Sequence, residues 1–269
     1  MEMLNTTARK TVPFIMRHRL CMLTAMTLLW ATAAQSGEPP VTYTPEQVIK
    51  KSIAHHDPSG VWGTARIRLG VHTTYSEEFA AKAGSNEAAL VLILSPGHEE
   101  FSYTKEAGDN KIEITLLQGQ GVLAVNGSTD VSPEEKERLR LREPEFYRDY
   151  CEYLYGMPMK LRDSGTIIAP QVNSVRFNDR VVWELRVTYD PEVGKHTWYF
   201  YFDHDTFALV GYKFHLDEPK NDGEYITMKG EIVDEDSGLR LPKARAWYYN
   251  ADDGHLATDD IVSITTLGN

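Results

Sequence analysis

Cysteine and positive charge are both scarce in this 269-residue chain. Only Cys21 and Cys151 are present, and 28 Lys and Arg stand against 39 Asp and Glu, for a formal net charge of −11. Nucleic acids and anionic lipid surfaces attract basic stripes, so the acidic balance argues against both as partners. The acidity itself is best explained by solubility.

Signatures of common enzyme sites are also absent. The sequence contains no G-x-S-x-G elbow, no P-loop and no dinucleotide-binding glycine fingerprint. It has no H-x-x-x-H pair and no paired cysteines of the kind that hold zinc. We therefore expect no cofactor, and we assign no residue to a catalytic or metal-binding role.

Two short polar stretches contain residues that could serve in an enzyme, which is the alternative hypothesis. His55, His56 and Asp57 are good metal ligands, but adjacent helical residues point ~100° apart, and histidines before an Asp-Pro turn suit a helix C-terminus. Asp203 and Asp205 flank a histidine and could bind a cation, although a hairpin tip favours turn formation. The alternative is a metal-assisted hydrolase using His56/Asp57 or Asp203/Asp205.

The N-terminus has the order of a secretory signal peptide. A basic lead precedes a charge-free apolar run at 20–30, and small residues follow it. The run is shorter than the ~20 residues that a membrane-spanning helix needs. We predict a signal peptide over 1–34, a linker over 35–42 and a single domain over 43–269, in a periplasmic or secreted protein without a transmembrane span.

Removal of that leader would change both the cysteine content and the charge. Cys21 lies within it, preceded by Arg19 and Leu20 in place of the small residues that precede a lipidated cysteine. Cys151 would then be the sole cysteine, so the mature chain would fold on its core without an internal disulfide. The leader is basic, so its loss makes the net charge more negative.

Two helical blocks are predicted. Thr44, Pro45 and Gln47 provide a cap, a first-turn proline and a capping box for a first helix. Ser132 begins a second block, which Pro144 interrupts or restarts. After that proline, aromatic and apolar residues share one broad helical face. They are Phe146, Tyr147, Tyr150, Tyr153 and Leu154.

The rest of the chain predicts strands separated by turns. Apolar residues alternate with polar ones over 181–189, whereas 88–94 is a continuous apolar run that should be buried on both faces. The segment 121–125 ends at an Asn-Gly pair, which is a strong turn signal. A turn about every 8–12 residues is typical of an antiparallel meander, and we expect roughly ten or eleven strands in a mainly β, α+β domain.

The stretch 196–216, HTWYFYFDHDTFALVGYKFHL, is the main clue to function. Its first arm has two aromatic faces. Trp198, Phe200 and Phe202 form one face, and Tyr199 and Tyr201 form the other. A strand that is apolar on both sides is covered on both, or faces a core on one side and a cavity on the other. This pattern indicates a binding function and does not indicate any particular reaction.

Three strings carry a resemblance to a known family. His56-Asp57-Pro58 with Trp62 close behind, the run 198–203 and the run 221–226 resemble an uncharacterised family of secreted bacterial proteins. That family is similar in fold to the LolA/LolB-like lipoprotein carriers. The resemblance implies a curved antiparallel half-barrel that wraps helices around an apolar cavity, and it carries over no catalytic residue.

We therefore predict a soluble periplasmic binding protein for a hydrophobic ligand, either a lipid or an acylated partner protein. An envelope module whose sheet edge binds another chain is a further alternative. The residues expected to line the cavity are aromatic or apolar. They are Trp62, Phe146, Tyr150, Leu154, Trp183, Trp198, Phe200 and Phe202.

Overall fold

The computed structural model describes residues 42–98 and 100–267, which belong to one compact unit. The predicted signal peptide lies outside the described residues, as does nearly all of the predicted linker. No helix in the described part of the chain is long and apolar enough to cross a membrane.

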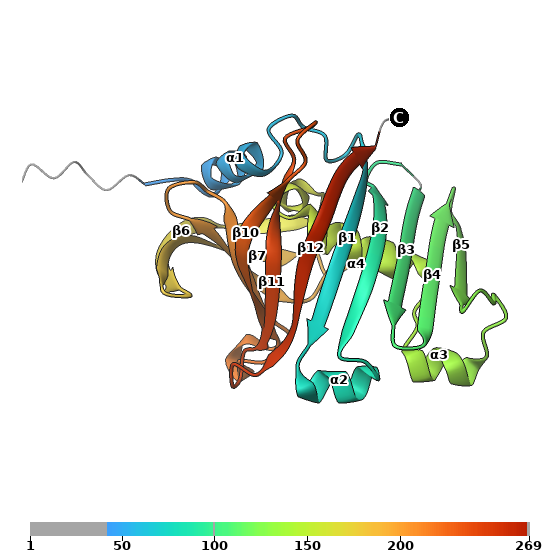
Figure 1. Ribbon diagram of the computed structural model, residues 1–269. Coiled ribbons are helices and arrows are strands. Elements are labelled where there is room, and N and C mark those ends of the chain that lie inside the picture. Colours follow the sequence, from blue (N-terminus) through green and yellow to red (C-terminus); the bar gives the residue numbers. More distant parts are fainter. Residues whose placement is uncertain (1–41, 99, 268–269) are drawn as a thin grey trace, which may run out of the picture. The chain divides into compact units, whose positions relative to one another are not determined.

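In this described part of the chain, twelve strands form one open antiparallel sheet in the order β5-β4-β3-β2-β1-β12-β11-β10-β9-β8-β7-β6 (Figure 1). The first half comprises β1 (Arg66–Tyr75), β2 (Glu87–Ser95), β3 (Glu100–Ala107), β4 (Asn110–Leu117) and β5 (Gln120–Val125). The second half comprises β6 (Thr166–Phe177), β7 (Arg180–Tyr189), β8 (Thr197–Asp203), β9 (Leu209–His215), β10 (Glu224–Val233), β11 (Arg240–Tyr249) and β12 (His255–Leu267). Each half is a meander, and pairing of β1 with β12 joins the two.

Helices α1 (Pro45–His56) and α4 (Pro144–Gly156) bury side chains in the same core cluster on one face of this curved sheet. The shorter helical segments lie in connections: α2 (Glu77–Ala83) between β1 and β2, α3 (Pro133–Leu139) before α4, and the 3-10 turns η1 (Met159–Arg162) and η2 (Glu218–Lys220) before β6 and β10. Helix α4 packs on β2 to β5, and α1 packs on β6 and β11. The predicted mainly β half-barrel wrapping helices is confirmed, with twelve strands among the described residues in place of ten or eleven.

The two longer helices begin where the sequence predicts. Thr44 caps α1 with a complete capping box to Gln47, and Pro144 starts α4. Helix α2 was not predicted, although its signals are present. Ser76 accepts a hydrogen bond from the Phe79 amide, and Gly84 ends the helix with φ 74°. A seven-residue helix between two strands is short enough to be mistaken for part of a loop.

The core lies between α4 and the inner face of the sheet. Leu92 and Leu94 of β2 are fully buried, as is Phe200 of β8. Leu154 and Tyr155 of α4 pack into the same cluster. Because a fully buried side chain of this size contributes roughly 1.5–3 kcal/mol, this face holds α4 firmly and presents its remaining side chains to the second half of the sheet.

Candidate functional site

The C-terminal end of α4 is positioned by a close contact with Trp62. A Cβ atom at Gly156 would lie 2.4 Å from Trp62 Cζ2, so only glycine fits there. The Asp57 carboxylate fixes the backbone at Trp62 by accepting the amides of Val61 at 2.8 Å and Trp62 at 2.9 Å. Trp62 is 7% exposed and therefore packs the helix onto the sheet.

An aromatic groove of about 370 Å³ lies between α4 and strands β8 to β11. We define the aromatic groove by its lining residues, which are Phe146, Asp149, Tyr150, Tyr153, Leu154, His196, Trp198, Tyr212, Phe214, Glu224 and Trp247. The helix supplies one wall and four adjacent strands supply the other. Volumes of a few hundred Å³ with mostly apolar lining and few polar groups are typical of small-molecule sites.

Ring contacts organise the wall made by the sheet. Trp198 lies 4.8 Å from Phe214 and 5.6 Å from Tyr212, measured between ring centroids. Its ring is also 5.2 Å from that of Tyr153 on the helix, which closes the groove at that point. Tyr153 in turn shares a hydrogen bond of 2.8 Å with the hydroxyl of Tyr189. The wall is thus preformed by packing.

The opposite wall leaves large aromatic surface open to solvent. Phe146 is 52% exposed and Tyr150 is 47% exposed. Their rings stack at 6.1 Å with an interplanar angle of 6°. Glu224 also lines the groove, and burial raises the pKa of its carboxyl above the ordinary value.

A second opening of about 500 Å³ adjoins the aromatic groove. The two share Asp149, Tyr153, His196 and Trp198 in their linings. The added surface is more polar and includes Lys160. The shared residues make the two openings neighbouring parts of one larger depression beside α4.

The structure brings four of the eight predicted cavity residues together. Phe146, Tyr150, Leu154 and Trp198 line the aromatic groove. The other four belong to the packed core: Trp62, Trp183, Phe200 and Phe202 are each at most 8% exposed. Trp183 stacks on His204 at 4.2 Å and donates its indole N–H to the carbonyl of His204 at 3.1 Å.

Several groove residues were not predicted. Phe214 and Tyr212 lie opposite Trp198 and Phe200 across the β8–β9 pairing, and the hairpin pattern in the sequence could have revealed them. Trp247 comes from β11, three strands away from β8. Only the sheet order places it here, and no local signal in the sequence indicates that order.

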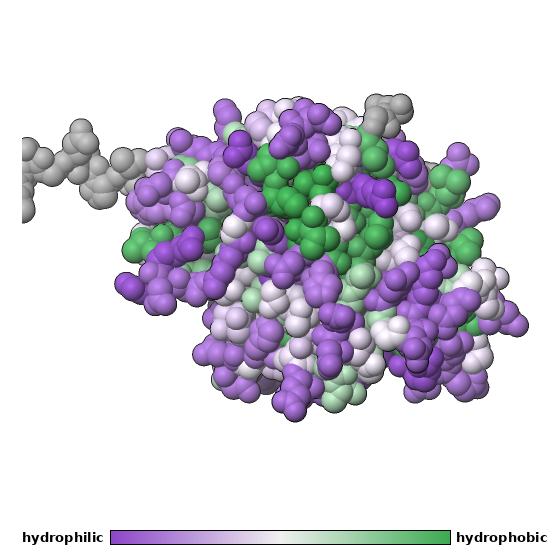
Figure 2. Space-filling view, in the orientation of Figure 1, coloured by the Kyte–Doolittle hydropathy of each residue, from purple (hydrophilic) through white to green (hydrophobic). Residues whose placement is uncertain are grey.

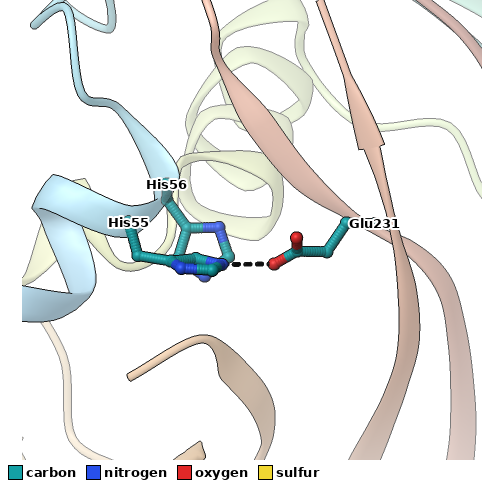
Figure 3. Close-up of side chains that lie close together, drawn as sticks. All are labelled: His55, His56 and Glu231. Atoms are coloured by element: carbon teal, nitrogen blue, oxygen red, sulfur yellow. Dashed lines mark hydrogen bonds and ion pairs between the residues drawn. The ribbon is translucent and has the colours of Figure 1, made fainter. Parts of the chain in front are cut away.

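The two histidines at the end of α1 come together with Glu231 of β10, which was not predicted, whereas Asp57 accepts backbone amides of the following turn. His55, His56 and Glu231 have ligand-type atoms within 4.8 Å of one another (Figure 3). His55 Nε2 lies 2.5 Å from Glu231 Oε1. The two rings lie 5.0 Å apart between centroids, but His55 contacts Glu231 of β10, whereas His56 bonds to backbone groups of β9 and β11.

Both ring nitrogens of His56 already have partners. Nε2 accepts the amide hydrogen of Leu209 at 2.8 Å, so the neutral ring carries its proton on Nδ1 and donates it to the Arg240 carbonyl at 2.8 Å. Burial lowers the pKa of His56 to about 4. A metal ion could take His56 only by breaking one of these bonds, so the ring acts as a link between α1, β9 and β11.

The acidic tip between β8 and β9 is a turn. Asp203 Oδ1 accepts hydrogen bonds from the Thr206 amide and hydroxyl, each at 2.9 Å, and from the Asp205 amide at 3.2 Å. The side chain of Asp205 is 94% exposed. Asp203 therefore shapes the turn. It also lines an opening of about 280 Å³ whose other lining residues include His55 and Glu231, whereas Asp205 is not among them.

Apolar surface also occurs over β1, β2 and β12 (Figure 2). Val91 of β2 is 38% exposed and Val262 of β12 is 64% exposed. Their neighbours Leu92 and Ile261 are fully buried. Because side chains alternate along a strand, Val91 and Val262 point away from the inner face and are separate from the aromatic groove.

Comparison with known families assigns the chain to a family. The profile described as "Family of unknown function (DUF6503)" matches residues 18–263. The chain belongs to this family. The membership predicted from the sequence, in a family of unknown function, is confirmed. A search of curated protein sequences finds no match.

Solved structures similar to this chain include a LolA superfamily protein from Nitrosomonas europaea, with a TM-score of 0.45, 10% identity and coverage of 84% of this chain and 94% of that one. A DUF1329 family protein from Desulfovibrio piger has a TM-score of 0.49, 8% identity and coverage of 82% and 92%. A chain of the MucA/MucB complex from Pseudomonas aeruginosa has a TM-score of 0.22 and 10% identity, with coverage of 82% of this chain and 98% of that one. Function is therefore inferred from this chain's own side chains.

Proposed function

We propose that this protein binds a hydrophobic ligand, a lipid or an acylated partner, in the aromatic groove. The observation that carries the proposal is the groove itself, about 370 Å³ lined mainly by aromatic rings between α4 and the sheet. No catalytic step is proposed, since the acidic and histidine groups of the rival hydrolase are engaged in turns and in linking elements.

Solvent exposure on the helix side supports this reading. Phe146 and Tyr150 keep about half of their surface exposed in a face that otherwise packs into the core. Removing apolar area from water contributes roughly 25 cal/mol per Å². A hydrocarbon chain packed against these rings would bury apolar surface that is exposed to water in the empty groove, and this burial favours binding. Rings held in place by packing lose little freedom when the ligand enters.

The proposed setting is the periplasm or the extracellular space. The basic, apolar and small-residue order of residues 1–34 supports export of the chain. An exported carrier of this kind would hold an apolar ligand away from water between membranes, with its ligand-free groove open to the solvent.

Replacement of Tyr150 by alanine tests the proposal. The tyrosine is 47% exposed, so its loss should leave folding intact while removing one wall of the groove. We expect the affinity for the uncharged fluorescent probe Nile red, measured by titration, to fall about tenfold, the value of one large aromatic contact.

Tyr249→Ala is the matched control. Tyr249 is 36% exposed on β11 and does not line the groove. Equal Nile red binding by the wild type and by both variants would place the probe elsewhere and contradict the proposal.

A further inference from the structure

A basic hollow of about 320 Å³ lies beside the first turn of α4. Five cationic side chains line it, contributed by α2, β3 and the segment from α3 to α4. They are Lys82, Lys105, Arg138, Arg140 and Arg142. The rest of its lining includes four tyrosine or phenylalanine rings besides Phe146, and it includes no carboxylate.

This grouping opposes the charge balance of the chain. Acidic residues outnumber basic ones by 39 to 28, yet only basic ones face this hollow. Two of the cations have partners outside the lining. Lys82 pairs with Glu78 at 2.6 Å and Arg138 with Glu135 at 3.4 Å, each within its own helix.

The other three cations have no ion pair among the described residues. Lys105 Nζ lies 5.7 Å from the centre of the Tyr75 ring. Arg140 adopts a left-handed backbone with φ 53° where α3 ends. Arg140 and Lys82 come from separate elements and line the same hollow. An anion in the hollow would place a negative charge beside cations from both elements.

The basic hollow and the aromatic groove share Phe146. On the groove side its ring stacks on Tyr150 at 6.1 Å. On the other side it contacts Tyr147 at 5.8 Å, and Tyr147 lies 5.1 Å from Tyr103, which lines the hollow. One exposed ring therefore separates a cationic depression from an apolar one.

We propose that the basic hollow binds the anionic group of an amphiphile, a phosphate, sulfate or carboxylate, whose hydrocarbon lies in the aromatic groove. This inference rests on the proposed function and specifies its ligand as an anionic amphiphile. Charge complementarity selects the anionic head group. The hydrocarbon of the ligand would pass Phe146, which lines both the basic hollow and the aromatic groove. The overall acidity repels extended anionic surfaces, whereas the hollow attracts a single anionic group at short range.

The double variant Arg140→Asn/Arg142→Gln tests this ligand class. Asparagine tolerates the left-handed backbone at position 140, so the change removes charge with little strain. The control Lys50→Gln/Lys243→Gln removes the same charge from two exposed positions outside the hollow. Isothermal titration with n-dodecyl phosphate, with uncharged n-dodecyl maltoside below micelle-forming concentrations, and with inorganic phosphate compares head groups.

We expect the wild type and the control to bind dodecyl phosphate at least about tenfold more tightly than the hollow variant, as lost charge-assisted bonds predict. Dodecyl maltoside should bind all three proteins alike. Equal binding of both amphiphiles to wild type and variant would overturn the head-group site and leave the proposed function standing. Inorganic phosphate binding as tightly as dodecyl phosphate would also overturn it. Failure of both amphiphiles to bind would contradict the proposed function itself.

Discussion

His56 shows how a residue that looks functional can be structural. Its ring is fully buried at the end of α1 and is bonded at both nitrogens to backbone groups of β9 and β11. The sequence could predict its place at a helix end, from the Asp-Pro turn that follows. It could not predict the partners, which lie more than 150 positions away along the chain.

Acid should reveal this role of His56. Its pKa falls from 6.5 to about 4 in the folded protein because burial disfavours the charged ring. Between these pH values His56 is protonated in the unfolded chain and neutral in the folded chain. The free energy of unfolding therefore decreases as the pH falls from 6.5 to 4. The full effect is ~3 kcal/mol, and it is complete below pH 4.

Urea unfolding across that pH window measures the effect. His56→Gln should flatten the profile relative to the wild type, while His98→Gln, at an exposed position, should leave it unchanged. A wild-type profile with the same slope as that of His56→Gln would show that His56 titrates normally in the folded protein.

At the scale of the element, helix α4 supplies one wall of the groove, and its C-terminal end packs closely on Trp62 at Gly156. Its first residue and its amphipathic face were predictable, because Pro144 and the aromatic spacing are local signals. Which of its rings would stay exposed was not predictable. Phe146 and Leu154 share a face in the sequence pattern, yet one is 52% exposed and the other 5%, because β2 to β5 cover only part of the helix.

Gly156→Ala should loosen α4. The added Cβ would meet Trp62 at 2.4 Å and Lys160 Cγ at 2.7 Å, so the helix end must shift. We expect a loss of ~1–3 kcal/mol in the free energy of unfolding, as for other overpacked sites. Gly194→Ala is the matched control, because its nearest contact would be an ordinary 3.5 Å. Equal stabilities of the two variants in denaturant titrations would contradict the contact.

At the scale of the whole described unit, the sheet gathers its functional surface from distant segments. Pairing of β1 with β12 joins two meanders into one open sheet, and the groove lies between α4 and strands of the second meander. Alternation and turn signals were enough to predict strands in an antiparallel meander, and the family resemblance implied their open half-barrel arrangement. The groove required the order of strands as well, since Trp198 and Trp247 meet only through that order.

Native mass spectrometry of the purified protein can detect an apolar guest in the aromatic groove. We expect a species heavier than the polypeptide by the mass of one amphiphile. Organic solvent should release that amphiphile, and Tyr150→Ala should retain less of it. A wild-type protein that carries only its own mass, and that takes up no lipid when incubated with a bacterial lipid extract, would contradict the account.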